Sequence, residues 1–567
     1  MCMLKLDCPY LTFLWLPIGI SLREPIQRTL NWLFLLPGQR PPRKGVIYML
    51  QIKNLTITHK KDLRVILDNF KLTLNAGDKA VIIGEEGNGK STLMKWIVDP
   101  ELADEYAECE GERIITGETI GYLPQELPAA DGELTLYEYF AAKEAFLEQS
   151  PRDLSAMASD FGVPADFFYG DQLMKSLSGG EKIKAELMRL LMERPSALLL
   201  DEPSNDIDID TLKLLEKLIN GFKGIVLFIS HDETLIENTA NMVVHLELVE
   251  HKRKSRFTVM HLAYREYVET RLKNLEKQEQ EAENDRRQKK IREDKYNKLY
   301  QSVTSALGNV SRQAPGVGKN LKDKMHTVKA MGKRFEKMDE EMTERPDTEE
   351  AIFFKLGGKD AAMPQGKTVI EYSLDKLTTP DESRVLSQDI FMRLRGPMKV
   401  CIVGDNGCGK TTLIKKMAEE LMARPDIRVQ YMPQNYEEML NMDETPVDFL
   451  DKSGDKEERT RIRTYLGALK YTAEEMDHPI RALSGGQKAK VFLLKMSLSD
   501  ANVLILDEPT RNFSPLSGPV IRGILKDFPG AIISISHDRK YISEVCDTVY
   551  ELTEAGLKEA ENFIANN

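Results

Sequence analysis

The stretch that decides the fold is Gly84-Glu85-Glu86-Gly87-Asn88-Gly89-Lys90-Ser91-Thr92. It fits the pattern Gly-x-x-x-x-Gly-Lys-Ser/Thr, and it stands between an apolar run at 80–83 and a helix-like run at 91–96. A strand, a glycine-rich loop and a helix form the context in which this pattern binds phosphate, because backbone N–H groups and the helix N-terminus face the anion. We expect Lys90 to reach the outer phosphates and the Ser91 hydroxyl to ligate magnesium.

A second loop repeats the first. It reads Gly404-Asp405-Asn406-Gly407-Cys408-Gly409-Lys410-Thr411-Thr412 and follows the apolar run 400–403. Lys410 and Thr411 are therefore the expected phosphate and magnesium residues of a second site. One such loop can arise by chance, but two in matching contexts are very improbable.

Three further patterns also occur twice. They are Leu-Ser-Gly-Gly at 177–180 and 483–486, an apolar run ending Asp-Glu-Pro at 201–203 and 507–509, and Ser-His-Asp at 230–232 and 536–538. Their copies share one offset, since 484−178, 507−201 and 537−231 each give 306. The loop lysines differ by 410−90 = 320, so the first copy holds 320−306 = 14 additional residues between these patterns. The chain therefore contains two copies of one domain.

Composition restricts the class of protein. The chain has 567 residues, 41% hydrophobic and 30% charged, with a net charge of −12, which is typical of a soluble multidomain protein. No apolar stretch approaches the ~18 residues of a membrane helix. Six cysteines without a C-x-x-C pair argue against zinc and a disulfide framework, and Cys408 in a phosphate loop favours the reducing cytoplasm. We expect residues 1–48 to be a non-native or disordered extension, with Met49 as the true start.

The motif set, in this order and present twice, resembles the ATP-binding cassette (ABC) superfamily over about 49–250 and 346–567. The resemblance implies an α/β fold of two tandem P-loop ABC ATPase domains, with ATP and Mg2+ as cofactors. It also implies that ATP is hydrolysed between the two domains.

The resemblance assigns roles to acidic residues. Asp201 and Asp507 end apolar strands and should hold magnesium, while Glu202 and Glu508 should polarise the attacking water as general bases. A helix-capping turn is the alternative for an isolated Asp-Glu pair.

Other roles also follow from the resemblance. Gln125 and Gln434 occupy the place of the family's magnesium-sensing glutamine, and His231 and His537 should contact the γ-phosphate. The expected magnesium residues are Ser91, Gln125, Asp201, Thr411, Gln434 and Asp507.

The signature patterns Ser178-Gly179-Gly180 and Ser484-Gly485-Gly486 open helices and should serve the opposite domain. Lys90 and Glu202 would share one ATP with Ser484 and Gly486, and Lys410 and Glu508 the other with Ser178 and Gly180.

Two departures affect these sites. The loop after the first Asp-Glu reads Asn205-Asp206-Ile207-Asp208, near the family's usual Asn-His-Leu-Asp, whereas the second reads 511–515, Arg-Asn-Phe-Ser-Pro, and lacks the acidic end. The two sites are therefore expected to hydrolyse ATP unequally. His59 stands near the expected adenine-stacking position in the first copy, and the second copy offers no clear counterpart.

The segment 251–345 between the copies is basic, with 24 Lys and Arg against 15 Asp and Glu. It predicts a helix over about 262–303, a loop over 305–318 with Arg312 and Lys319 among apolar residues, and a helix over about 321–342. A solvated coiled-coil spacer is the plain alternative, but the positive charge favours contact with nucleic acid.

Two fused cassettes, a charged helical linker and Tyr264 and Tyr267 at its start resemble the ABC-F family. The resemblance implies a monomer with an intramolecular cassette sandwich that binds the ribosome, with the linker reaching rRNA and peptidyl-tRNA near the peptidyl-transferase centre. The 511–515 loop favours the branch that protects ribosomes from antibiotics in Gram-positive bacteria. A housekeeping ABC-F translation factor, a transporter's ATPase subunit and a DNA-repair ATPase remain the alternatives.

Overall fold

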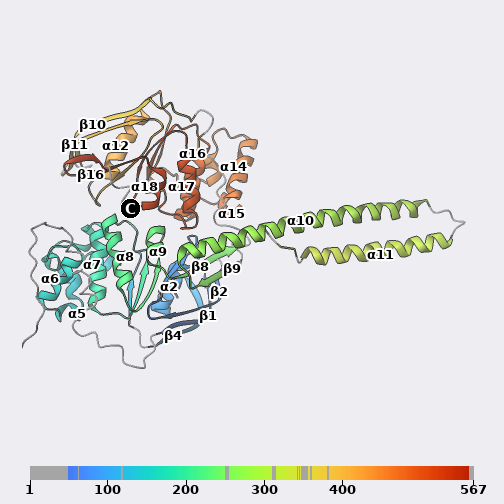
Figure 1. The fold of residues 1–567 in the computed structure, drawn as a ribbon, viewed down its shortest axis with the longest axis horizontal. Coiled ribbons are helices and arrows are strands. Elements are labelled where there is room, and N and C mark those ends of the chain that lie inside the picture. Colours follow the sequence, from blue (N-terminus) through green and yellow to red (C-terminus); the bar gives the residue numbers. More distant parts are fainter. Residues whose placement is uncertain are drawn as a thin grey trace, which may run out of the picture.

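The computed structural model describes residues 49–61, 63–116, 119–249, 254–309, 315–340, 342–343, 345–346, 356–357, 361–379, 382 and 384–560. They form two α/β cassettes that face one another and a helical hairpin that projects from them (Figure 1). The predicted extension 1–48 and the predicted tip residues Val310 and Arg312 lie outside the described residues.

The first cassette is organised around a six-stranded sheet of order β5-β6-β7-β3-β8-β9. All neighbouring strands are parallel except β8 and β9, which form an antiparallel pair. Strands β6 and β7 are buried along their whole length, as expected for parallel strands covered on both faces. The strands are β3 (Lys79–Ile83), β5 (Ile120–Leu123), β6 (Ala197–Asp201), β7 (Ile225–Ile229), β8 (Met242–Val249) and β9 (Lys254–Met260).

A second sheet of three antiparallel strands, of order β2-β1-β4, completes this cassette. It comprises β1 (Met49–His59), β2 (Val65–Asn75) and β4 (Ala107–Thr116). The spacing from the loop lysine to the glutamine is 125−90 = 35 residues in the first copy and 434−410 = 24 in the second. The segment between Lys90 and Gln125 therefore holds 35−24 = 11 of the 14 additional residues. The insertion therefore contains β4, which pairs with β1 and has no counterpart among the described strands of the second copy.

The second cassette repeats the main sheet in the order β13-β14-β15-β12-β16-β17. Its strands are β12 (Lys399–Val403), β13 (Val429–Met432), β14 (Val503–Asp507), β15 (Ala531–Ile535), β16 (Thr548–Thr553) and β17 (Gly556–Glu559), beside the hairpin of β10 (Thr368–Thr378) and β11 (Val385–Arg395). This matching strand order confirms the fold predicted from the repeated motifs.

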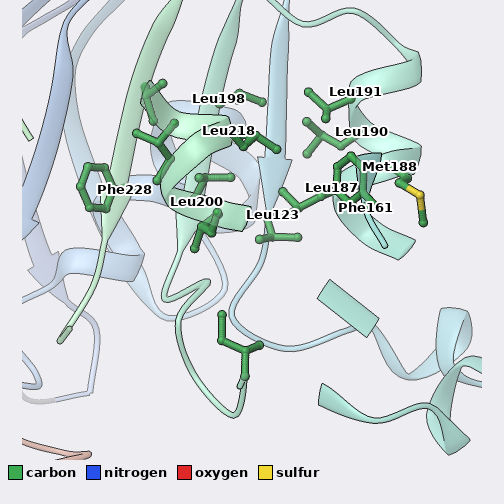
Figure 2. Packing of buried hydrophobic residues seen from close by; sticks show 14 of the residues in the cluster. Leu123, Phe161, Leu187, Met188, Leu190, Leu191, Leu198, Leu200, Leu218 and Phe228 are labelled. Carbon is green, nitrogen blue, oxygen red and sulfur yellow. The ribbon is translucent and has the colours of Figure 1, made fainter. Parts of the chain in front are cut away.

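Helices cover the sheets and present the repeated motifs. In the first cassette these are α2 (Lys90–Val98), α3 (Ala129–Gly132), α4 (Leu136–Ala141), α5 (Glu144–Leu147), α6 (Pro151–Asp160), α7 (Gly179–Met192), α8 (Ile209–Gly221) and α9 (Glu233–Thr239). The second holds α12 (Lys410–Met422), α13 (Pro446–Leu450), α14 (Lys456–Ala468), α15 (Ala473–Asp477), α16 (Gly485–Ser497), α17 (Gly518–Lys526) and α18 (Arg539–Val545). Figure 2 shows how the signature helix α7 packs, with Leu187 and Leu190 near Leu123 and Leu198 of the sheet.

The linker forms the predicted hairpin, with different limits. Helix α10 spans Tyr264–Gly308 and helix α11 spans Pro315–Glu340, so the predicted loop over 305–318 is too long. Proline is well tolerated in the first turn of a helix, where its missing N–H is not needed, and this explains how α11 begins at Pro315. Residues 254–260, which the sequence assigns to the linker, lie in β9 at the edge of the first sheet.

The hairpin is held together along its length. The rings of Tyr296 and Phe335 meet edge to face with centroids 6.4 Å apart, and Arg292 forms an ion pair of 3.0 Å with Asp339. Val328, on the predicted apolar face of α11, is buried. Within the described part of the chain, no helix is both long and apolar enough to cross a lipid bilayer.

Candidate functional site

The two predicted phosphate loops have the same geometry. Gly87 and Gly89 take φ values of 80°, a left-handed conformation that glycine adopts without strain, and Gly407 and Gly409 repeat it at 81° and 101°. The Lys90 ammonium donates to the carbonyl oxygens of Gly84 and Glu85 at 2.8 and 3.0 Å. Lys410 makes the same two bonds in the second loop. Each lysine therefore lies across its loop, positioned to exchange carbonyl partners for phosphate oxygens.

The residues beneath each loop fit a divalent cation. The Ser91 hydroxyl donates to Asp201 Oδ1 at 3.0 Å, while the buried Oδ2 atoms of Asp201 and Asp507 have no hydrogen-bond partner. Burial raises the pKa of both carboxyl groups to about 6. A buried carboxylate oxygen without a hydrogen-bond donor costs folding free energy. A hard cation such as Mg2+ would bind such an oxygen, because carboxylate oxygens are among its preferred ligands.

The first loop faces the second signature motif. The backbone N–H of Gly486 donates to Glu86 Oε2 at 2.8 Å, and Lys490 forms an ion pair of 2.6 Å with Glu85. A cavity of about 300 Å³ lies between them, with Ser484 in its wall. These contacts bring together residues some 400 positions apart, although Lys90 and Glu202, which were predicted to share this ATP, do not line the cavity.

The second loop faces the first signature motif. Ser178 and Gly179 line a cavity of about 530 Å³ together with Lys410, Thr411 and Glu508. Gly180 does not line it, since it packs against the Asp208 and Thr211 side chains. Gly485 similarly borders a neighbouring cavity rather than the one beside the first loop.

Glu202, the candidate base of the first site, is held by three side chains. The Gln125 amide donates to Glu202 Oε2 at 3.1 Å, the Asn205 amide donates to the same oxygen, and His231 Nε2 lies 3.4 Å from Oε1. Burial alone would raise the pKa of Glu202. The hydrogen bond and charge of His231, the charge of Lys90 and the hydrogen bond of Asn205 together outweigh burial and lower the pKa to about 2. His231 Nδ1 lies 2.8 Å from the Phe513 carbonyl of the other cassette. Because a carbonyl can only accept, Nδ1 carries a proton.

Glu508, the candidate base of the second site, has weaker partners. The Ser536 hydroxyl and the His537 N–H reach its Oε2 at 3.4 Å, and His537 Nε2 lies 3.9 Å from Oε1, which has no hydrogen bond. Burial, with the charge of Asp507, raises its pKa to about 8. Burial, with the charge of Lys410, lowers the His537 pKa to about 4. Gln434 donates to Asp206 at 3.2 Å instead of to Glu508. The two sites therefore differ at the group predicted to do the chemistry.

Some residues near these sites escape prediction from the motifs. Arg64 lines the cavity beside Glu85 and Glu86, whereas His59, the predicted stacking residue, does not line it.

A cluster of buried charges also joins the cassettes: Glu233 of α9 pairs with Arg522 and Lys540 of the second cassette, at 3.0 and 2.9 Å. No local sequence pattern indicates this contact between the cassettes.

Comparisons with known proteins agree with this architecture. Residues 67–205 and 386–511 match the protein family described as ABC transporter. The chain is 27% identical over 536 residues to the ribosome protection protein VmlR of Bacillus subtilis, covering 91% of this chain and 89% of that protein. It is 24% identical over 568 residues to ABC transporter F family member 5 of Arabidopsis thaliana, covering 91% and 76%.

Among solved structures, the archaeal ribosome recycling factor aABCE1 aligns over 90% of this chain and 91% of its own, with a TM-score of 0.54 and 15% identity. This likeness supports the tandem fold. The chain is thus a tandem ABC ATPase, an enzyme that binds and hydrolyses ATP. Its two tandem cassettes, with no membrane-spanning helix among the described residues, make it similar to the relatives of the ABC transporter F family.

Proposed function

We propose that this chain is a cytoplasmic, ribosome-associated ATPase that protects ribosomes from antibiotics through its linker. The observation that supports this most strongly is the hairpin α10–α11, which projects away from both cassettes and takes no part in the ATP sites (Figure 1). At 1.5 Å per residue, the 45 residues of α10 span roughly 67 Å, long enough to reach deep into a large partner. VmlR, one of the relatives, bears the name ribosome protection protein.

The surface of the hairpin suits a polyanionic partner. Helix α11 carries seven Lys and Arg against four Asp and Glu in a chain whose net charge is −12. Lys322, Lys329, Lys333 and Arg334 are all exposed. Exposed basic side chains on a helix bind the RNA backbone by charge, with little dependence on base sequence.

The root of the hairpin connects to the first phosphate loop. The Asn88 amide donates to the Leu246 carbonyl on β8 at 2.9 Å. The two neighbours of Leu246 on β8 contact helix α10. His245 Nδ1 lies 2.7 Å from the Tyr267 hydroxyl, and Glu247 forms an ion pair of 3.0 Å with Arg271. Because these contacts are buried, a change in the loop on nucleotide binding can alter the anchoring of the linker helix.

In the proposed cycle, the phosphate loops and the opposite signature motifs hold two ATP molecules between the cassettes. Asp201, Asp507, Ser91 and Thr411 would hold the metal, which would supply positive charge to neutralise the phosphates. Glu202 and Glu508 orient and deprotonate water, and hydrolysis separates the cassettes.

The test is a ribosome co-sedimentation assay with the Glu202→Gln/Glu508→Gln variant. Loss of both bases should leave ATP binding intact, keep the sandwich closed and retain the protein on ribosomes, with turnover reduced by at least 100-fold. Undiminished turnover would show that the bases are assigned wrongly, and absence of ribosome association in ATP would contradict the ribosomal role.

A second experiment addresses the protective role. Expression in a drug-sensitive host should raise tolerance to drugs acting at the peptidyl-transferase centre, and Lys322→Glu/Lys333→Glu should abolish this tolerance with ATPase activity intact. Lys456→Glu/Lys558→Glu, a matched change at exposed lysines of the second cassette, should have no effect. Ribosome binding without drug tolerance would favour a housekeeping translation factor.

A further inference from the structure

Asp206 occupies a position where the two cassettes differ. It follows Asp201-Glu202 in the loop that faces the second ATP site, and its counterpart, at 206+306 = 512, is an asparagine. The Asn512 amide donates to the Tyr436 hydroxyl at 3.2 Å, within its own cassette. Asp206 instead contacts three side chains of the opposite cassette.

These three contacts surround Asp206. Arg511 pairs with its Oδ2 at 2.7 Å, Gln434 donates to its Oδ1 at 3.2 Å, and the Asn406 amide of the second phosphate loop donates to its carbonyl oxygen. All three partners belong to the second ATP site. One residue of the first cassette therefore contacts three residues that line the second site.

The equivalent side chains in the first site have another partner. Gln125 corresponds to Gln434 by order in the motif set, and Asn205 corresponds to Arg511, since 205+306 = 511. Both Gln125 and Asn205 donate to Glu202. In the second site both counterparts bind Asp206, and Glu508 has neither as a donor.

The position of the trio shows that it forms part of the wall of the second site. Asp206, Gln434 and Arg511 line the cavity of about 530 Å³ that holds Lys410 and Glu508. The same three residues line an adjacent cavity of about 470 Å³. They form the partition between the two spaces.

We propose that Asp206 is a positioning residue that acts across the interface: it holds Gln434 and Arg511 away from Glu508 and makes the second ATP site slower than the first. This inference rests on the proposed assignment of Glu202 and Glu508 as general bases. Asp206 does not touch the reacting atoms, so its effect is on the orientation of the groups around them.

Single-turnover hydrolysis of pre-bound ATP tests the proposal in the full chain. The wild type should show a fast and a slow phase of phosphate release, and Glu508→Gln should remove only the slow phase. Asp206→Ala should accelerate the slow phase, on the order of 10-fold, because a well-oriented base contributes a factor of about 10²–10⁴. The fast phase should change by less than about twofold. Asp206→Glu, which keeps the carboxylate, should retain both wild-type phases.

Two controls separate positioning from a general structural effect. Asp210→Ala removes an exposed acid from the adjacent helix α8 and should leave both phases unchanged. Arg511→Asn, which gives the second site the residue present in the first, should also accelerate the slow phase. Unchanged or slower release in Asp206→Ala, or a single phase in the wild type, would overturn the proposal. Failure of the base assignment is distinguishable, because Glu508→Gln would then leave both phases in place.

Discussion

The ion pair between Glu233 and Arg522 should contribute strongly to closure of the sandwich. The side chains are 5% and 4% exposed and lie 3.0 Å apart, one on each cassette. Removing one partner of such a buried pair typically costs about 3–5 kcal/mol, because the other charge stays in a poorly solvated place, whereas removing both costs far less. Lys540 also pairs with Glu233 and Glu544 with Arg522, so each remaining charge keeps one other partner and the cost should lie at the lower end of this range.

We therefore expect Glu233→Met to disfavour the closed state by about 3 kcal/mol, which corresponds to roughly a 100-fold shift in the closing equilibrium. The double variant Glu233→Met/Arg522→Met should recover at least half of this loss. Energy transfer between dyes on the two cassettes, measured as ATP is titrated in the Glu202→Gln/Glu508→Gln background, reports closure directly.

The matched control is the exposed pair Arg481–Asp443, whose side chains are 66% and 77% exposed. Asp443→Asn should shift closure by less than about threefold, since exposed pairs contribute about 0–1 kcal/mol. The reasoning is refuted if Glu233→Met behaves like this control, or if the double variant loses the sum of the two single losses.

Three other outcomes follow from the structure. Gly84→Ala should abolish ATP binding to the first site in an equilibrium binding assay, because the added Cβ would lie 2.2 Å from the Leu246 carbonyl oxygen. Tyr267→Phe should remove a buried hydrogen bond worth about 1 kcal/mol and increase amide exchange at the start of α10, with ATPase activity unchanged; unaltered exchange would contradict this anchor. Burial raises the pKa of Glu186 to about 7, above its unfolded value of about 4.5. Ionisation of this carboxyl group therefore lowers the free energy of unfolding as the pH rises from about 4.5 through 7. Glu186→Gln should therefore raise the unfolding free energy by about 1–3 kcal/mol at pH 8 and have little effect at pH 4; an equal gain at both would contradict it.

Local sequence patterns predicted the elements that carry the motifs. The apolar run before Lys90 became β3, and the glycines around it occupy backbone conformations that other residues rarely adopt. The offset of 306 shared by three patterns predicted a duplicated domain, because an insertion between those patterns in one copy would have changed it. These features depend on residues close together in the chain, and so they can be read from it.

Contacts between distant residues could not be predicted in the same way. Nothing local to Asp206 indicates that its carboxylate meets Gln434 and Arg511, because their meeting depends on how two finished domains face one another. The ends of the linker helices were also misplaced. Gly308, Pro315 and the glycines after it indicated a longer loop, whereas α10 continues to Gly308 and α11 begins at Pro315, where a first-turn proline needs no N–H partner.

The contact between His231 and the Phe513 carbonyl has a consequence for variation of this chain. The acceptor is a main-chain oxygen, so any of the twenty amino acids at 513 still supplies it. A substitution there can weaken the contact only by moving the loop, for instance by emptying the space that the buried Phe513 ring fills. Most single substitutions at 513 should therefore preserve the contact between His231 and the opposite cassette. Contacts made by side chains, such as those of Asp206, are lost when the residue changes.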